Sequence, residues 1–322
     1  MEMAKPAPAR RDRTVLTSPA IRRLQRLHFL VFDVAPFAGV VALVALWPKT
    51  APSALDLVMF FVLWAATGLG ITVGFHRRFS HRAFQCGPGV DATLIVLASM
   101  AARGPMFSWT AMHRRHHERS DREGDLHSPN LFGASRMARM RGFLHAHFTW
   151  MARHDYPNAG YYIPDLVGEP ALVRWNRRYH ACVVAGLAAP ALIGGVATGS
   201  WGGAASGFLW GGVLRLFVVE HTMNAINSLG HLVGERPFGR GADRSRNMAW
   251  ASVASWGEAW HNNHHAFPWS AAFGLGWRQP DPGLWLIRAL ERLGLAWDVK
   301  RPDPARIAAR AVNDSAERAG GA

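Results

Sequence analysis

The chain is short of charge and of cysteine. Of its 322 residues only 18% are charged, against about a quarter in an average soluble domain, and 49% are hydrophobic. This apolar content excludes an intrinsically disordered protein. The two cysteines, Cys86 and Cys182, are too few for a disulfide framework, a cysteine zinc ribbon or a four-cysteine iron–sulfur cluster.

Several familiar metal-site motifs are also missing. The sequence has no His-Glu-x-x-His zinc protease signature and no pair of Glu-x-x-His motifs of the soluble di-iron type. No Ser/His/Asp nucleophile motif points to a hydrolase. What the sequence does have is 16 histidines and several long apolar runs.

Four apolar runs come close to the length of about 20 residues that a helix needs to cross a bilayer. They lie at residues 30–47, 57–75, 182–198 and 204–219. A fifth run, Ala92 to Ala102, is too short to span and predicts an interfacial or buried helix. The four long runs predict an all-α integral membrane protein; the alternative is a set of buried helices in a large soluble protein.

Basic residues are distributed unevenly around these runs. Seven basic residues precede the first run, and fifteen arginines lie between the second and third runs. By contrast, the link between the first and second runs has one lysine, and the link between the third and fourth has no basic residue. Because Lys and Arg stay on the cytoplasmic side, we expect both termini and the long middle segment there. No aromatic-basic stripe or nucleic-acid motif accompanies the charge, so no nucleic-acid partner is expected.

Eight histidines form three clusters in the segments expected to be cytoplasmic. The second and third clusters share the pattern H-x-x-H-H, whose imidazoles are expected to point the same way on a helix. The first two histidines are five residues apart, so they converge only if the helix ends or loosens between them. The clusters are His76 and His81; His113, His116 and His117; and His261, His264 and His265.

These clusters predict a metal centre with more than one ion. Eight histidines exceed the capacity of one tetrahedral zinc, so two metals are expected. Neutral imidazole suits zinc, copper, iron and nickel alike. A ninth candidate is His231, with Asn227 four residues before it on the same helix face, where the amide is placed to hold a metal-bound water. The other seven histidines are expected to be supporting or surface groups.

Together these boxes resemble the membrane fatty acid desaturases, and in particular the stearoyl-CoA Δ9 desaturase branch. The resemblance covers most of the chain from Phe75 to Pro302. The segment Gly257 to Pro268 is very similar to that branch's third histidine box with its flanks, and Asn227 to His231 matches its Asn-Ser-x-x-His. The segments Asp125 to Pro129 and Gly142 to His145 resemble the stretch after its second box.

The resemblance implies four transmembrane helices topped by a cytoplasmic helical cap that holds a di-iron site. It implies a desaturase domain over residues 27–302, between a polar tail at 1–26 and a C-terminal tail at 303–322. Trp109 matches a tunnel-lining tryptophan of the family, and Met223 stands where the animal enzymes have a polar residue. The implied metal ligands are His76, His81, His113, His116, His117, His231, His261, His264 and His265, with Asn227 acting through water.

The implied reaction is the insertion of a cis double bond, at carbon 9 in that branch, into a saturated acyl chain by means of O2 and two electrons. The acyl carrier stays open among CoA, acyl carrier protein and membrane lipid. No haem-binding cytochrome b5 motif appears, so electrons are expected from a separate ferredoxin, flavoprotein reductase or cytochrome b5. The alternatives are hydroxylation of a fatty acid, alkane or carotenoid on the same core, and a zinc-binding membrane protein.

Overall fold

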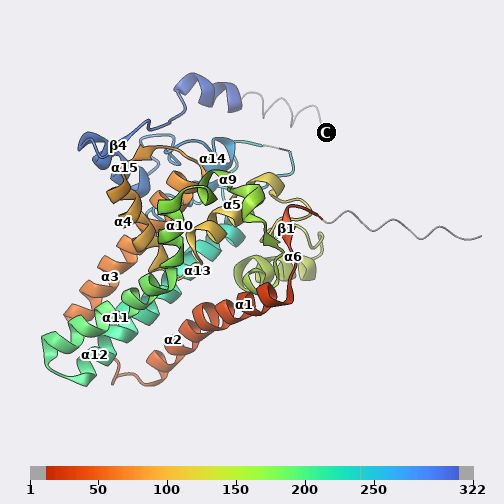
Figure 1. Ribbon diagram of the computed structural model, residues 1–322. Coiled ribbons are helices and arrows are strands. Elements are labelled where there is room, and N and C mark those ends of the chain that lie inside the picture. Colours follow the sequence, from red (N-terminus) through yellow and green to blue (C-terminus); the bar gives the residue numbers. More distant parts are fainter. Residues whose placement is uncertain (1–11, 240, 312–322) are drawn as a thin grey trace, which may run out of the picture.

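The computed structural model describes residues 12–239 and 241–311, and helices dominate it (Figure 1). Four continuous helices are long and apolar enough to cross a membrane: Pro19–Ala45, Ala54–Ser80, Tyr179–Thr198 and Trp201–His231. They contain the four predicted runs, except that the first helix ends at Ala45, two residues early. The predicted all-α membrane fold is confirmed.

Three of these helices contain wider, π-helical segments, labelled η here together with the short 3₁₀ turns. The first consists of α1 (Pro19–Phe29), η1 (Leu30–Val34) and α2 (Ala35–Ala45), and the second of α3 (Ala54–Leu69) and η2 (Gly70–Ser80). The third is α11 (Tyr179–Thr198), and the fourth consists of α12 (Trp201–Gly207), η4 (Phe208–Leu214), α13 (Arg215–Ser228) and the 3₁₀ turn η5 (Leu229–His231).

Local sequence explains where the membrane helices begin and end. Ser53 and Asp56 form a reciprocal capping box that starts α3. Gly199 ends α11 in the left-handed conformation, at φ 61°, and the Ser200 side chain then caps α12 by accepting from the Gly203 amide. These signals fold the two short links back on themselves and make two helical hairpins.

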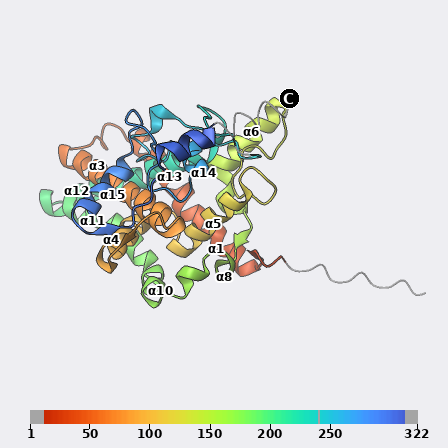
Figure 2. The ribbon, with the colours of Figure 1, turned by 90° about the horizontal axis from the view of Figure 1, so that it is seen from above.

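The cap is built from residues 81–178 and 232–302 and lies at one end of the long helices (Figure 1). Seen from above, α6 and α10 lie toward opposite sides of the molecule (Figure 2). Its helical elements are α4 (Pro88–Ser99), α5 (Met106–Arg119), α6 (Arg136–Leu144), η3 (His145–Thr149), α7 (Trp150–Arg153), α8 (Ala159–Tyr162), α9 (Pro164–Val167), α10 (Pro170–Arg177), η6 (Ala249–Ala251), α14 (His261–Ala266) and α15 (Pro282–Arg292).

The fifth apolar run belongs to α4, which packs against the second membrane helix. At Gly70 an added Cβ would lie 2.4 Å from the backbone nitrogen of Ala98, and at Gly74 it would lie 2.9 Å from Cβ of Leu94. Only glycine permits this approach. The contact buries Leu94 and Ala98 and fixes the depth at which η2 meets the cap.

Part of each expected tail is folded onto the rest of the molecule. In the N-terminal tail, β1 (Val15–Leu16) pairs antiparallel with β3 (Tyr156–Pro157), and α1 begins at Pro19. Ahead of the C-terminal tail, β2 (Gln85–Cys86) pairs with β4 (Ala296–Trp297), and residues 304–311 are helical. The outer parts of the two tails, 1–11 and 312–322, lie outside the described residues.

Candidate metal centre

All nine nominated histidines gather in two adjacent groups where the cap meets the membrane helices. Within each group the candidate ligand atoms lie within 4.8 Å of one another. Asn227 lines a small cavity beside them. The first group is His76, His81, His113, His117 and His264, and the second is His116, His231, His261 and His265.

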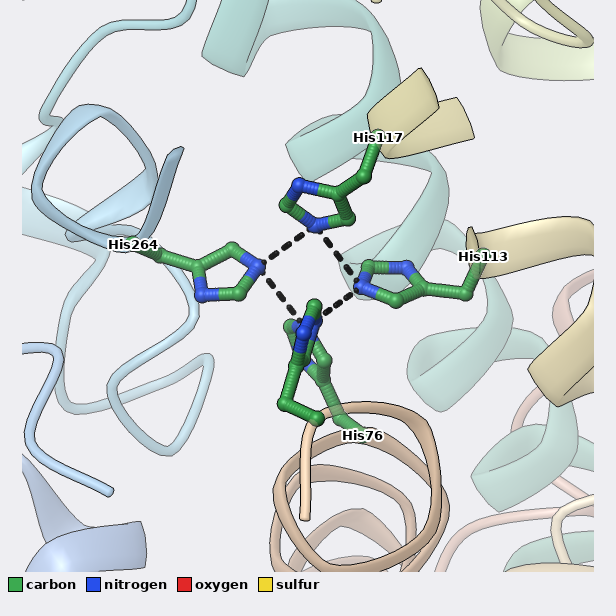
Figure 3. A group of neighbouring side chains, drawn as sticks. His76, His113, His117 and His264 are labelled. Atoms are coloured by element: carbon green, nitrogen blue, oxygen red, sulfur yellow. Dashed lines mark hydrogen bonds between the residues drawn. The ribbon is translucent and has the colours of Figure 1, made fainter. Parts of the chain in front are cut away.

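The first group brings five Nε2 atoms to one point (Figure 3). The Nε2 of His113 lies 2.7 Å from that of His81 and 3.0 Å from that of His117. The Nε2 of His264 lies 2.8 Å from that of His117 and 3.0 Å from that of His76. Rings from η2, α5 and α14, which are far apart in the sequence, therefore face one centre.

The second group has fewer close contacts between its ring nitrogens than the first. The Nε2 atoms of His231 and His261 are 2.9 Å apart. The Nε2 atoms of His116 and His265 are buried and have no hydrogen-bond partner. A buried polar atom without a partner costs free energy, so these nitrogens call for a ligand.

Each H-x-x-H-H triplet divides between the two groups, and does not point its three rings one way as the spacing suggested. On α5, His113 and His117 face the first group and His116 faces the second. On α14, His264 faces the first group, whereas His261 and His265 face the second. The reason is the helical rotation of about 100° per residue, which keeps residues four apart together and turns the intermediate one aside.

The first pair converges because the helix widens. His76 lies within the π-helical η2, and the His81 amide at its end donates to the His76 carbonyl at 3.2 Å, five residues back. Such i→i+5 bonding brings residues five apart close to one face. The helix therefore loosens at His76 and ends at Ser80, just before His81.

Four carboxylates hold histidines of the two groups from behind. The Nδ1 of His76 donates to Glu258 at 2.7 Å, and that of His116 donates to Asp125 at 2.9 Å. The other two pairs are His231 with Asp121 at 2.8 Å and His265 with Asp243 at 3.0 Å. Each bond fixes the tautomer, so the Nε2 of that ring carries a bare lone pair directed inward.

The electrostatics suit neutral imidazoles held by ionised carboxylates. Burial lowers the pKa of His113, His117 and His264 well below the usual value, and neighbouring imidazoles lower it further. Burial alone would raise the pKa of Asp125 and Glu258, but the facing imidazoles bring it below the usual range. Neutral rings at physiological pH are the form that binds a metal.

The two groups fit two metal ions. Hydrogen bonds alone cannot satisfy the Nε2 atoms of the first group. A neutral imidazole has one N–H, and that of His76 is the Nδ1–H that donates to Glu258, so its Nε2 has no hydrogen to donate. Two nitrogens that each lie about 2.1 Å from one ion at right angles are about 3 Å apart. The observed separations of 2.7–3.0 Å match that spacing.

Comparison with known proteins decides the class. Residues 53–279 match the fatty acid desaturase family. The chain belongs to that family. It is 43% identical over 308 residues, 95% of each chain, to the hex-5-enoyl-[acyl-carrier protein] acetylenase of Moorena producens (strain JHB). It is 32% identical to the sn-1 stearoyl-lipid 9-desaturase of Anabaena variabilis, covering 89% of this chain and 97% of that one.

A plant relative is similar at the same level. The Delta-9 acyl-lipid desaturase 1 of Arabidopsis thaliana is 33% identical, covering 87% of this chain and 86% of that one. This desaturase is therefore an oxidoreductase of lipid metabolism, and its histidine groups fit the di-iron site that the family generally uses.

Two cavities of the desaturase meet beside the histidines. The larger, about 480 Å³, lies between α1, α5 and α11 and is lined mostly by apolar side chains. The smaller, about 50 Å³, is lined by His76, His113, His116 and His261, members of both groups. Arg103, Met112 and Met151 line both cavities, so the two cavities adjoin at these side chains.

Trp109 and Met223 both line the smaller cavity. The Trp109 indole stacks on the His113 ring, with the ring centroids 5.1 Å apart and the planes at 15°. His127, one of the histidines expected to be supporting or surface groups, is buried against His116 with the ring centroids 4.2 Å apart. Sequence reasoning left the four carboxylates unassigned, although Asp125 and Glu258 stand in the segments that resemble the family.

Proposed function

We propose that this desaturase inserts a cis double bond into a saturated acyl chain, at carbon 9 as the resemblance implies. The reaction removes one hydrogen from each of two adjacent carbons. It also consumes O2, two electrons and two protons, which come from outside the substrate, and it releases two waters. Two bound irons would supply the activation of O2 that unactivated carbons require. The convergence of nine histidines in two groups, beside a small cavity that adjoins a larger apolar one, is the observation that supports this proposal.

The ligand roles follow the two groups. The first ion would be held by His76, His81, His113, His117 and His264. The second would be held by His116, His231, His261 and His265, with Asn227 acting through a water. Glu258, Asp125, Asp121 and Asp243 keep four of these rings in place and add ligand basicity.

The cavities give the acyl chain its path. The larger cavity would receive the chain from the carrier, and the smaller would hold the reacting carbons beside the histidines. Trp109 fixes the chain at that point because its indole is stacked on His113. Positioning of this kind determines which carbons meet the oxidant.

We propose that both termini and the metal centre face the cytoplasm, since arginines cluster in the cap segments. Electrons would come from a separate ferredoxin, flavoprotein reductase or cytochrome b5. The acyl chain would come from CoA, acyl carrier protein or a membrane lipid, and assays should offer all three. The name of the relative from Moorena gives an acyl chain on acyl carrier protein as its substrate.

The decisive test is expression in a host that lacks unsaturated fatty acids, with products analysed by mass spectrometry. We expect the native chain to produce unsaturated acyl chains and His264→Ala to produce none, because its Nε2 is 2.8 Å from that of His117 at the first centre. His145→Ala is the matched control, since His145 lies in neither group.

The outcomes separate the alternatives. Full activity in His264→Ala would remove His264 from the centre. An alcohol without an alkene would indicate hydroxylation. Protein that holds zinc when iron is supplied, and that consumes no oxygen, would indicate a zinc-binding membrane protein.

A further inference from the structure

The space around the metal centre is very unequal on its two sides. The larger cavity, about 480 Å³, lies on the side of α1 and α11, whereas the small cavity beneath the histidines holds about 50 Å³. A group the size of a water needs about 10–15 Å³ on this measure. The small cavity therefore accommodates about three to five such groups, and a methylene is of similar size.

Tightly packed side chains close the far side of the small cavity. Met223 lies on α13 one turn below Asn227, and its side chain lines the cavity. Below it Met223 joins a continuous buried cluster with Phe75 and Val219. Phe75 and Val219 are fully buried, so side chains from both helices fill the cluster to which Met223 belongs.

The same cluster includes Trp256. A Cβ on Gly68 would lie only 2.0 Å from the Trp256 ring, so the indole rests directly on the backbone of α3. Gly68 is eight residues before His76 on the same continuous helix. The Trp256 ring is also 4.9 Å from that of Trp64 and is buried with the Met223 cluster.

The wall beside this space is also held in place. Arg103 donates to Asn224 at 2.8 Å and pairs with Glu220 at 3.5 Å, and all three are buried. These contacts fix the guanidinium against α13, between the two cavities. The small cavity therefore has a rigid side as well as a packed end.

We propose that this desaturase acts close to the methyl end of its acyl substrate, because Met223 closes the small cavity beside the histidines and the buried Trp256 belongs to the cluster packed behind it. The inference rests on the proposed function. The small cavity also holds the two reacting carbons, so no more than about three carbons lie beyond them. A carbon-9 double bond then belongs to a chain of at most about 13 carbons, whereas a carbon-9 bond in an 18-carbon chain leaves eight carbons beyond.

The test supplies saturated acyl chains of 8 to 18 carbons, on acyl carrier protein and on CoA, to iron-loaded protein with an electron donor. The position of each double bond is read by mass spectrometry. We expect every product to have its double bond within about the last five carbons, and we expect no carbon-9 product from the 18-carbon chain. That carbon-9 product from native protein would overturn the proposal.

Two variants test the wall directly. Met223→Ala should move the double bond about two to three carbons further from the methyl end, and Met223→Ala with Trp256→Leu should move it further still. Trp250→Leu is the control, since Trp250 is 77% exposed. An unshifted bond in active, iron-loaded Met223→Ala would overturn the proposal. Iron-loaded native protein that desaturates no chain of any length would overturn the proposed function itself, and the length limit with it.

Discussion

At the residue scale, the metal centre depends on hydrogen bonds made away from the metal. Glu258 is buried, contacts both His76 and the Thr72 hydroxyl, and comes from the loop just before α14. It links the second membrane helix to the third histidine box. Removing its charge would therefore release a ligand from its orientation and leave the Nδ1 of His76 without an ionised acceptor.

We expect Glu258→Gln to lower iron affinity about 10- to 100-fold and activity in parallel. The amide keeps the shape of the side chain, but its neutral oxygen is a weaker acceptor for Nδ1–H, and its NH2 group can favour the opposite tautomer. Iron per polypeptide and turnover, measured on detergent-solubilised protein over a range of iron concentrations, provide the check. Glu291→Gln is the control, since Glu291 pairs with Arg301 on an exposed surface. Equal iron retention in both variants would contradict this role.

At the element scale, the widened helix η2 and its close neighbour α4 position the first histidine box. Gly70 and Gly74 allow α4 to approach the backbone of η2. That contact leaves no room for a side chain, and it lies directly below His76. The π-helical stretch thus has a packing partner as well as a ligand function, in keeping with the frequent occurrence of π-bulges at functional sites.

Gly70→Ala is expected to destabilise the protein by about 1–3 kcal/mol, because the new Cβ overlaps the α4 backbone and forces it away. The melting temperature in detergent should fall, and iron content should fall with it as His76 is displaced. Gly89→Ala is the matched control, because a Cβ there meets nothing within 4 Å. If both variants melt together with the native protein, the packing argument is wrong.

The sequence predicted the elements better than their local shape. Runs of apolar residues located the four membrane helices, because length and hydropathy suffice for that. The histidine boxes were found because their members are close in sequence. The widening at η2 was not predicted as such, since the five-residue spacing of His76 and His81 indicated only that the helix must loosen or end.

At the scale of the whole molecule, long-range partners escaped prediction. Asp121 contacts His231, which is 110 residues away in the sequence. Trp256, which follows the fourth membrane helix in the sequence, contacts Gly68 in the second. No spacing rule joins such residues, because only the tertiary fold brings them together. The same fold buries many neutral histidines and ionised carboxylates in one place, and this gives the protein a predictable response to acid.

We expect the metal-free protein to lose stability as the pH falls below about 6.5, the ordinary pKa of histidine. Burial lowers the folded-state pKa of His113, His117 and His261, so the unfolded chain binds more protons and stability falls with the pH. The lowered pKa of Asp125 adds to the loss below about pH 4. Melting temperatures of metal-free protein in detergent between pH 8 and 3 provide the check, and a flat profile would refute the expectation.

The division of each H-x-x-H-H triplet has a mechanical consequence. A single rigid turn of α5 carries rings to both metal positions, and so does a single turn of α14. Any tilt of either turn moves both positions at once, so neither can be loosened while the other stays tight. Two bound ions would therefore be coupled through shared backbone, and we expect their gain and loss to be concerted events.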